Sequence, residues 1–268
     1  MRNGMEIIDA HCHIYPEKIA ERAVAGTDNF YGIDSLCVGT AAVLLAECDT
    51  AGVDRAVVQS VATTPKQVAS INRFIADCVA QSGGRLIGLG TLHQDSEDQA
   101  ADLKNIMELG LHGVKLHPDI QNFKVDDDRA QRIYALCAEA GLPILIHTGD
   151  NRYDNSNPNR MLPMLRKFRD VTFVGAHFGG WSIWEDACRQ LSGEPTFYVD
   201  CSSSFYALSD ETAAKLIGDY GADRVLFGTD FPMWDPKTEL DTLMKFDLTD
   251  DGRRAILAEN AKKVFEFE

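Results

Sequence analysis

Short apolar runs alternate along this chain with longer segments of helical periodicity. The runs are rich in β-branched and aromatic residues, and they end near His13, Val61, Leu92, His117, His147, His177, Cys201 and Phe231. Apolar residues recur with helical spacing in the segments between them, over 40–51, 65–81, 97–110, 126–140, 158–168, 183–191, 209–219 and 236–246. Strands that are nearly continuous in apolar character and alternate with helices form parallel sheets covered by helices. The pattern therefore predicts an α/β fold.

The number of these units and the chain length indicate how the sheet is arranged. Eight strand-helix units in 268 residues fit a closed (β/α)8 TIM barrel better than an open sheet, with one domain spanning residues 1–268. Two connections are long: 16–40, which carries Phe30 and Tyr31 and is a candidate lid, and 149–160. In such barrels the active site lies at the carboxyl ends of the strands.

Charge and cysteine content restrict the partners and the compartment. The formal net charge of -15 argues against nucleic acid as a partner, because binding to phosphates needs a basic face. The seven cysteines include no Cys-x-x-Cys pair, which argues against a disulfide framework or a thiolate zinc site. With no apolar run of membrane-spanning length and no secretory signal pattern, we expect a cytoplasmic protein that does not bind membranes. A homo-oligomer stays possible.

Histidines gather where the predicted strands end. His11 and His13 are two residues apart on the first strand, so both imidazoles point to one face. The other strand ends carry His117, His147, His177 and Asp230. A single histidine at such a position is more simply a buried residue whose hydrogen bonds are satisfied within the core. Histidines at the ends of several strands, in contrast, predict a divalent metal site. Imidazoles and a carboxylate suit Zn²⁺ or a similar ion.

The motifs around these residues resemble those of the amidohydrolase superfamily, in particular the branch that contains aminocarboxymuconate-semialdehyde decarboxylase and related lactonases. The matching segments run from end to end of the chain, in order: Asp9-Ala-His-Cys-His, Gly113-Val-Lys-Leu-His-Pro, Ile146-His-Thr-Gly, Ala176-His-Phe-Gly-Gly, Gly228-Thr-Asp-Phe-Pro and Ile256-Leu-Ala-Glu-Asn-Ala-Lys-Lys-Val-Phe. The set is specific for the superfamily and much less so for the reaction.

The resemblance implies roles for individual residues. His11 and His13 match the metal ligands of the first strand, His147 the ligand of the fifth and Asp230 the ligand of the eighth. His177 matches a histidine that lies near the metal in mononuclear members and handles protons. The expected cofactor is one divalent ion, with zinc favoured, and His177 and Asp230 are the expected catalytic residues.

Three further residues are expected to bind the substrate: Lys115, His117 and Arg160. Lys115 and His117 are two apart and should face the same way. Some superfamily members carry a carbamylated lysine that bridges two metals, so a second metal with carbamylated Lys115 is the alternative to a lysine that pairs with a substrate carboxylate. Arg160, like Arg152, lies on the connection after the fifth strand, where a guanidinium can clamp a carboxylate.

The reaction stays open between three hypotheses. The first is hydrolysis of a small carboxylated ester, lactone or amide through a metal-activated water, because a bound cation lowers the pKa of water. The second is metal-dependent, non-oxidative decarboxylation of an aromatic or enol-type acid. The third is a barrel that binds a metal or ligand without catalysis. A substrate panel that follows carbon dioxide release and lactone turnover separates the first two.

Overall fold

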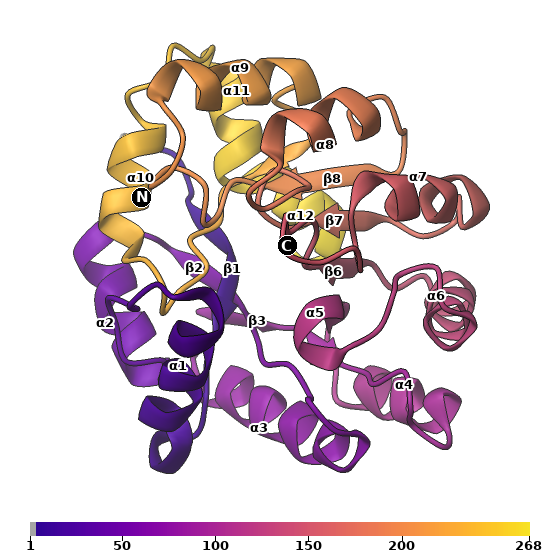
Figure 1. Cartoon of the computed structure of the whole chain (residues 1–268). Helices are drawn as coiled ribbons and strands as arrows, with labels where there is room; N and C mark the ends of the chain where they lie inside the picture. The colour runs from indigo at the N-terminus through magenta and orange to yellow at the C-terminus, as the bar shows by residue number, and fades with distance from the viewer. Residues whose placement is uncertain (1–3) are drawn as a thin grey trace.

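A computed structural model describes residues 4–268 and contains the predicted closed barrel. The strands pair in parallel in two runs, β1 to β3 and β4 to β9, each strand with the next along the chain, and helices surround the strands (Figure 1). The strands are β1 (Ile8–His13), β2 (Arg55–Gln59), β3 (Leu86–Gly88), β4 (Gly90–Thr91), β5 (Val114–Leu116), β6 (Ile144–Ile146), β7 (Phe173–Gly175), β8 (Phe197–Asp200) and β9 (Val225–Leu226).

These nine strand segments form a closed barrel of eight strands. β3 and β4 are halves of one strand, because Leu89 N–H donates back to Val58 of β2 while Gly90 N–H donates onward to Gly113 beside β5. The barrel closes between its first and last strands, where the N–H of Ala10 donates to the carbonyl of Phe227 over 2.8 Å. The predicted TIM barrel is therefore confirmed.

The helices agree with the predicted periodicities to within a few residues. Those expected from the sequence are α2 (Ala41–Ala51), η1 (Pro65–Gln67) with α3 (Val68–Gln81), α4 (Gln99–Glu108), α6 (Asp128–Ala140), α7 (Pro158–Lys167), α8 (Trp184–Leu191), α9 (Asp210–Tyr220) and α10 (Pro236–Leu243). Four more were not given bounds in advance: α1 (Glu17–Tyr31), α5 (Pro118–Gln121), α11 (Asp250–Arg254) and α12 (Asn260–Phe265), with the π-helical turn η2 (Ala255–Glu259) before α12. No helix in residues 4–268 is long and apolar enough to cross a membrane.

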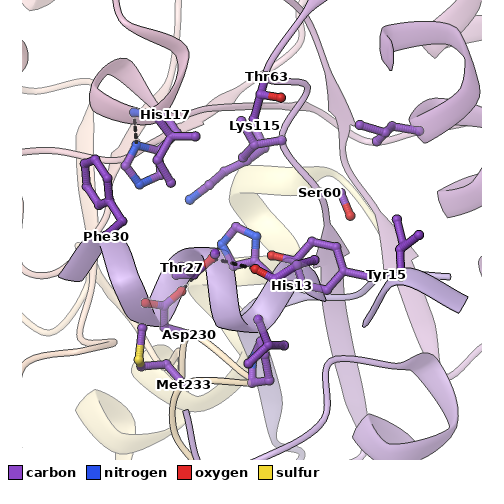
Figure 2. A pocket seen from close by; sticks show the side chains of 18 of the residues that line it. His13, Tyr15, Thr27, Phe30, Ser60, Thr63, Lys115, His117, Asp230 and Met233 are labelled. Atoms are coloured by element: carbon purple, nitrogen blue, oxygen red, sulfur yellow. Dashed lines mark hydrogen bonds and ion pairs between the residues drawn. The ribbon is translucent and has the colours of Figure 1, made fainter. Parts of the chain in front are cut away.

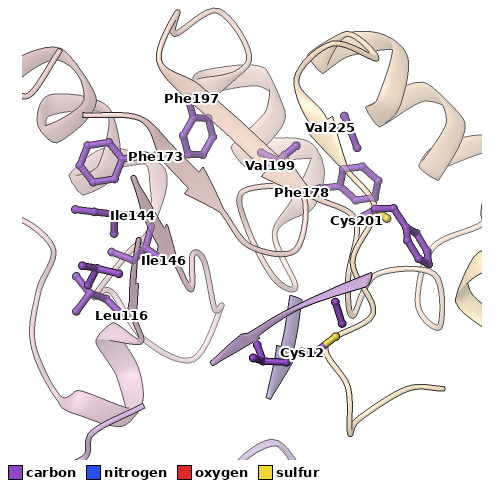
Figure 3. Packing of buried hydrophobic residues seen from close by; sticks show 14 of the residues in the cluster. Cys12, Leu116, Ile144, Ile146, Phe173, Phe178, Phe197, Val199, Cys201 and Val225 are labelled. Atoms are coloured by element: carbon purple, nitrogen blue, oxygen red, sulfur yellow. The ribbon is translucent and has the colours of Figure 1, made fainter. Parts of the chain in front are cut away.

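A bulge in β1 aims the two histidines of the opening motif into the barrel. The pairing register with β2 shifts between Asp9 and Cys12. Ile8 and Ala10 belong to the cluster that fills the barrel interior, whereas Cys12 packs in the layer between strands and helices (Figure 3). Because a one-residue shift exchanges the two faces of a strand, His11 and His13 follow Ala10 on the inner side. Cys12 faces the helix layer, as its position between the histidines predicts.

Several strands end earlier than the apolar runs suggest, and the chemically important residues follow them. β5 stops at Leu116, β6 at Ile146 and β7 at Gly175. His177 and Asp230 have positive φ angles of 60° and 61°, so the chain turns sharply at both residues. Positive φ is unfavourable for residues with a Cβ and often occurs at functional sites. The opposite end of the barrel is covered by α12, whose Val264 and Phe265 pack into the interior cluster.

Candidate metal and substrate site

A cavity of about 670 Å³ opens at the carboxyl ends of the strands. Its inner end is polar and its outer part runs between α1 and α3. Figure 2 shows Lys115 reaching into the space between His117, His13 and Asp230. The polar end is lined by residues from β1, β5 and α5 and from the segments that follow β5, β6, β7 and β9: His11, His13, Lys115, His117, Asp119, His147, His177 and Asp230.

Three of the predicted ligands converge on one point. The Nε2 atoms of His11 and His13 are 3.2 Å apart, and Oδ1 of Asp230 lies 3.3 Å from the first and 3.5 Å from the second. Ligands about 2 Å from a tetrahedral Zn²⁺ are separated by roughly 3.3 Å, so this triangle fits one face of such a site. Two imidazole nitrogens at this distance also repel each other unless a proton or a cation lies between them. The donor set therefore fits a divalent transition metal.

The orientation of His11 is set by a residue that the sequence did not single out. Nδ1 of His11 lies 2.9 Å from Oδ2 of Asp200, and both side chains are fully buried. A carboxylate accepts the Nδ1 proton, which leaves the Nε2 lone pair facing the cavity. Carboxylate partners of this kind orient metal-binding histidines in many proteins. Asp200 itself is held by the backbone N–H groups of His177 and Ser202, each at 3.1 Å from Oδ1.

Lys115 points at the same lone pair. Its Nζ lies 2.9 Å from Nε2 of His11, and the side chain is buried. The ammonium therefore donates to the nitrogen that a metal ion would bind. Burial lowers the pKa of Lys115, although Asp230 and Asp200 oppose this effect.

His147 pairs with His177 instead of joining the triangle. Nδ1 of His177 lies 3.1 Å from the carbonyl of Ser202, which can only accept, so this nitrogen carries the proton. Nε2 of His177 then accepts from Nδ1 of His147 over 3.1 Å. The ring of His117 stacks on that of His147 at 4.1 Å between centroids. The predicted ligand set is thus assembled in part, with three members together and His147 beside them.

Two buried polar atoms beside His147 face each other without a hydrogen bond. Nε2 of His147 faces Oδ2 of Asp119 at 3.6 Å, and neither atom has a hydrogen-bond partner among residues 4–268. Asp119 lies on α5, and its other oxygen accepts from Asn155 at 2.8 Å. Burial raises the pKa of Asp119 to about 6, because the charged carboxylate loses hydration.

The imidazoles of the site are uncharged at neutral pH. Burial lowers the pKa of His11, His13, His117 and His147 well below the usual value, and the positive charge of Lys115 acts in the same direction. Burial likewise lowers the pKa of His177, to about 4, against the opposing effect of Asp200. Neutral imidazole is the form that binds metals. Asp230 differs: burial raises its pKa, although Ser203 donates to its Oδ2 over 2.6 Å.

The predicted lid segment does reach the site, as the end of α1. The hydroxyl of Tyr31 lies 2.8 Å from Nε2 of His117. Arg152 attaches this end of the helix to the loop after β6: its guanidinium lies 5.1 Å from the ring of Phe30 and 5.3 Å from those of Tyr31 and Trp181. It also donates to the carbonyl of Phe30 over 2.8 Å and pairs with the buried Asp150.

The structure does not bring Arg160 to the site. Its guanidinium pairs with Asp126 at 2.8 Å and with Asp154 at 2.7 Å, and it does not line the cavity. Arg160 lies on α7, and two carboxylates satisfy its charge there. We therefore correct its predicted role from substrate binding to a structural ion pair.

The sequence did not identify two residues that contact the site histidines, Asp200 and Asp119. Asp200 ends β8, so the rule that found the other strand-end residues applies to it as well. Asp119 follows His117 by two residues at the start of α5, but no local pattern in the sequence indicates that it faces His147.

Comparisons with known proteins agree with this architecture. The family model described as amidohydrolase matches residues 8–267. A 2-amino-3-carboxymuconate-6-semialdehyde decarboxylase from Dictyostelium discoideum is 31% identical over 198 residues, which cover 60% of this chain and 55% of that protein. The match thus spans about half the length of this relative.

Solved structures share the fold at lower identity. An uncharacterised TIM-barrel protein from Bordetella bronchiseptica has a TM-score of 0.80 and 21% identity, covering 98% of this chain and 99% of that one. A 5-carboxyvanillate decarboxylase from Novosphingobium aromaticivorans, complexed with manganese and 4-hydroxy-3-methoxy-5-nitrobenzoic acid, has a TM-score of 0.75 and 16% identity, covering 99% and 97%. With the family model matching nearly the whole chain, this protein belongs to the amidohydrolase family of enzymes.

Proposed function

We propose that this protein is a metal-dependent, non-oxidative decarboxylase of a small aromatic or enol-type carboxylic acid. The observation that carries the proposal is the cluster of His11, His13, Asp230 and Lys115, which offers three metal-binding groups and an ammonium at the polar end of the cavity. The curated relative, named as a decarboxylase, supports this reaction over the hydrolysis that the sequence favoured.

The proposed metal ligands are His11, His13 and Asp230, whose donor atoms form the triangle described above. His147 stays in the proposed set because of its sequence motif. A divalent cation there supplies a Lewis acid that stabilises negative charge on an oxygen next to the breaking bond. Zinc as the natural ion, a single ion per chain and a cytoplasmic location stay predictions of the sequence.

Lys115 and His117 are the proposed substrate-binding residues. An ammonium buried at the end of the cavity attracts a carboxylate or phenolate, since such a charge is poorly screened away from water. His117 presents Nε2 to the cavity, where it now meets the hydroxyl of Tyr31. A substrate oxygen can replace that hydroxyl as its partner. Carbamylation of Lys115 remains the alternative, and it would remove this positive charge.

Asp230 is the proposed proton donor. In the reaction the bond from the carboxyl carbon to its neighbour breaks, carbon dioxide leaves, and the neighbouring carbon takes a proton. His177 holds its Nδ1 proton on Ser202, and its Nε2 is an acceptor. Asp230 faces the cavity, and its Oδ2, which is not part of the ligand triangle, is the atom proposed to carry the proton. His177 is proposed to assist in returning a proton to Asp230 after each turnover.

Carbon dioxide release tests the proposal directly. The protein is reconstituted with Zn²⁺ or Mn²⁺ and offered 2,6-dihydroxybenzoate, 5-carboxyvanillate and a panel of carboxylated lactones and esters. We expect carbon dioxide from an aromatic acid, no lactone turnover, and loss of activity in Asp230→Asn. The matched control is Asp223→Asn, whose side chain is 78% exposed. Hydrolysis of a lactone or ester without release of carbon dioxide would contradict the proposal and show that the protein is a hydrolase.

A further inference from the structure

The cavity has a second part that the proposed chemistry does not use. We call it the apolar arm and define it by three side chains of α1, one residue that follows β2 and two side chains of α3: Ile19, Ala23, Val24, Val61, Ile71 and Phe74. Figure 2 shows Thr27 and Phe30 of α1 across the cavity from Ser60 and Thr63. Outside the polar end, Lys18 is the only side chain with a formal charge among the described residues that line the cavity.

The side chains of α1 face this space instead of the protein core. Ile19, Ala23, Thr27 and Phe30 recur at helical spacing, so they lie along one face of the helix. Ala20 is the only residue of α1 that is fully buried. Ile19, Ala23 and Val24 are half-buried and, within residues 4–268, do not belong to the hydrophobic core. An amphipathic helix is normally stabilised by packing this face against another element, and here the face borders the cavity.

The size of the cavity exceeds what a single-ring acid needs. A volume of about 670 Å³ holds roughly 20 water molecules, whereas a molecule as small as benzoate displaces roughly six. A small acid bound at Lys115 and the metal ligands would therefore leave the apolar arm filled with water. An apolar group that displaces this water from the arm gains affinity through the hydrophobic effect.

We infer that the substrate is an amphiphilic acid, with its carboxylate at the polar end and an alkyl or aryl substituent in the apolar arm between α1 and α3. The reaction of this acid rests on the proposed function, whereas the shape of the ligand rests on the lining of the cavity alone. We place the substituent opposite the carboxylate, so that one end of the molecule meets Lys115 and the other end meets the apolar arm.

A pair of compounds tests this shape. We compare 2,6-dihydroxybenzoate with its 4-butyl homologue, in which the alkyl chain lies opposite the carboxylate. Each buried methylene improves affinity by up to about fourfold, so we expect kcat/KM for the butyl compound to be at least about tenfold higher. Equal or lower values for the butyl compound would overturn the inference.

Two variants of one helix show whether the gain arises in the apolar arm. Ala23→Phe fills the arm and should lower the ratio of the butyl to the parent kcat/KM by at least about tenfold. Ala25→Phe makes the same change at an exposed position of α1 and should keep the wild-type ratio. Circular dichroism checks the fold, and Val24→Phe replaces Ala23→Phe if that variant misfolds. A ratio that both variants leave unchanged would contradict the assignment.

Binding measurements separate this inference from the proposed function. Calorimetry on the metal-loaded protein gives Kd for both compounds whether or not they react. In one outcome neither compound releases carbon dioxide, the butyl compound binds at least tenfold more tightly, and only Ala23→Phe removes this difference. The proposed decarboxylation is then wrong, and the proposed shape of the ligand is right. If the parent acid is decarboxylated and the butyl group changes neither Kd nor kcat/KM, the reaction is right and the inference fails.

Discussion

The ammonium of Lys115 and Nε2 of His11 are 2.9 Å apart, at the lone pair that the proposed metal ion also needs. Because Nδ1 of His11 is occupied by Asp200, Nε2 is the only nitrogen of this ring that can bind a cation. A metal ion and the ammonium cannot both take this lone pair. Metal binding therefore has to displace Lys115, and the displaced ammonium is then available to a carboxylate in the cavity.

Removing the charge of Lys115 should strengthen metal binding and weaken catalysis. Lys115→Met keeps much of the side-chain volume but removes a cation that repels the metal ion. We expect the Kd for Zn²⁺, measured by competition with a chromogenic chelator, to fall by at least about tenfold, while decarboxylation is lost. Lys104→Met, on the exposed face of α4, is the control. An unchanged or weaker affinity in Lys115→Met would show that the two cations do not compete.

Loss of His11 should remove the metal. His11→Ala takes away one corner of the ligand triangle, so metal content after dialysis and decarboxylase activity should both fall to near background. Elemental analysis measures the first and carbon dioxide release the second. His112→Ala serves as the control, because His112 bonds to the carbonyl of Phe265 at the other end of the barrel. An active His11→Ala variant with a full complement of metal would refute the assignment.

Asp200 acts through His11 and should affect metal affinity more than fold. Asp200→Asn keeps the shape but removes the carboxylate that accepts the Nδ1 proton of His11. Partners of metal-binding histidines typically contribute about 10- to 100-fold in affinity, and we expect a loss of that size in the same chelator competition. If metal affinity stays at the wild-type value while the melting temperature drops, Asp200 has only a structural role.

The stability of the protein should depend on the ionisation of Glu239. This residue of α10 is buried, its Oε2 has no hydrogen-bond partner within residues 4–268, and burial raises its pKa from 4.5 to about 8. Between these two values the folded protein holds a proton that the unfolded chain releases. The contribution of Glu239 to stability is therefore complete below pH 4.5 and is lost as the pH rises toward 8.

Replacing this carboxyl group removes that pH dependence. Between pH 5 and pH 8 the wild type should lose stability relative to Glu239→Gln, by at most about 1.4 kcal/mol per pH unit. Urea unfolding at several pH values measures the difference, and Glu259→Gln, at an exposed position, should follow the wild type. A Glu239→Gln curve parallel to the wild type would mean that the pKa of Glu239 is not raised.

The sequence alone determined the barrel and the neighbourhood of the site. Apolar periodicity is a local property, so it located the strands and most helices to within a few residues. Parallel strands share one carboxyl edge, and this geometric rule predicts that His11, His13, His177 and Asp230 lie at the same cavity, as they do. The helix α1 was not predicted, because the segment 16–40 was interpreted as a long connection and the apolar face of the helix is made partly of small residues such as Ala20 and Ala23, which give a weak pattern.

Only the tertiary structure decided which partner each side chain takes. His11 faces Asp200 across 189 positions of sequence and Lys115 across 104, while Arg160 turns away from the cavity to two nearby carboxylates. A buried polar group must find a partner within hydrogen-bond distance, and that choice depends on how distant elements pack, not on local spacing. The residue types in the sequence therefore indicate a metal site, whereas the ligand pairing, the competing ammonium and the apolar arm follow from packing.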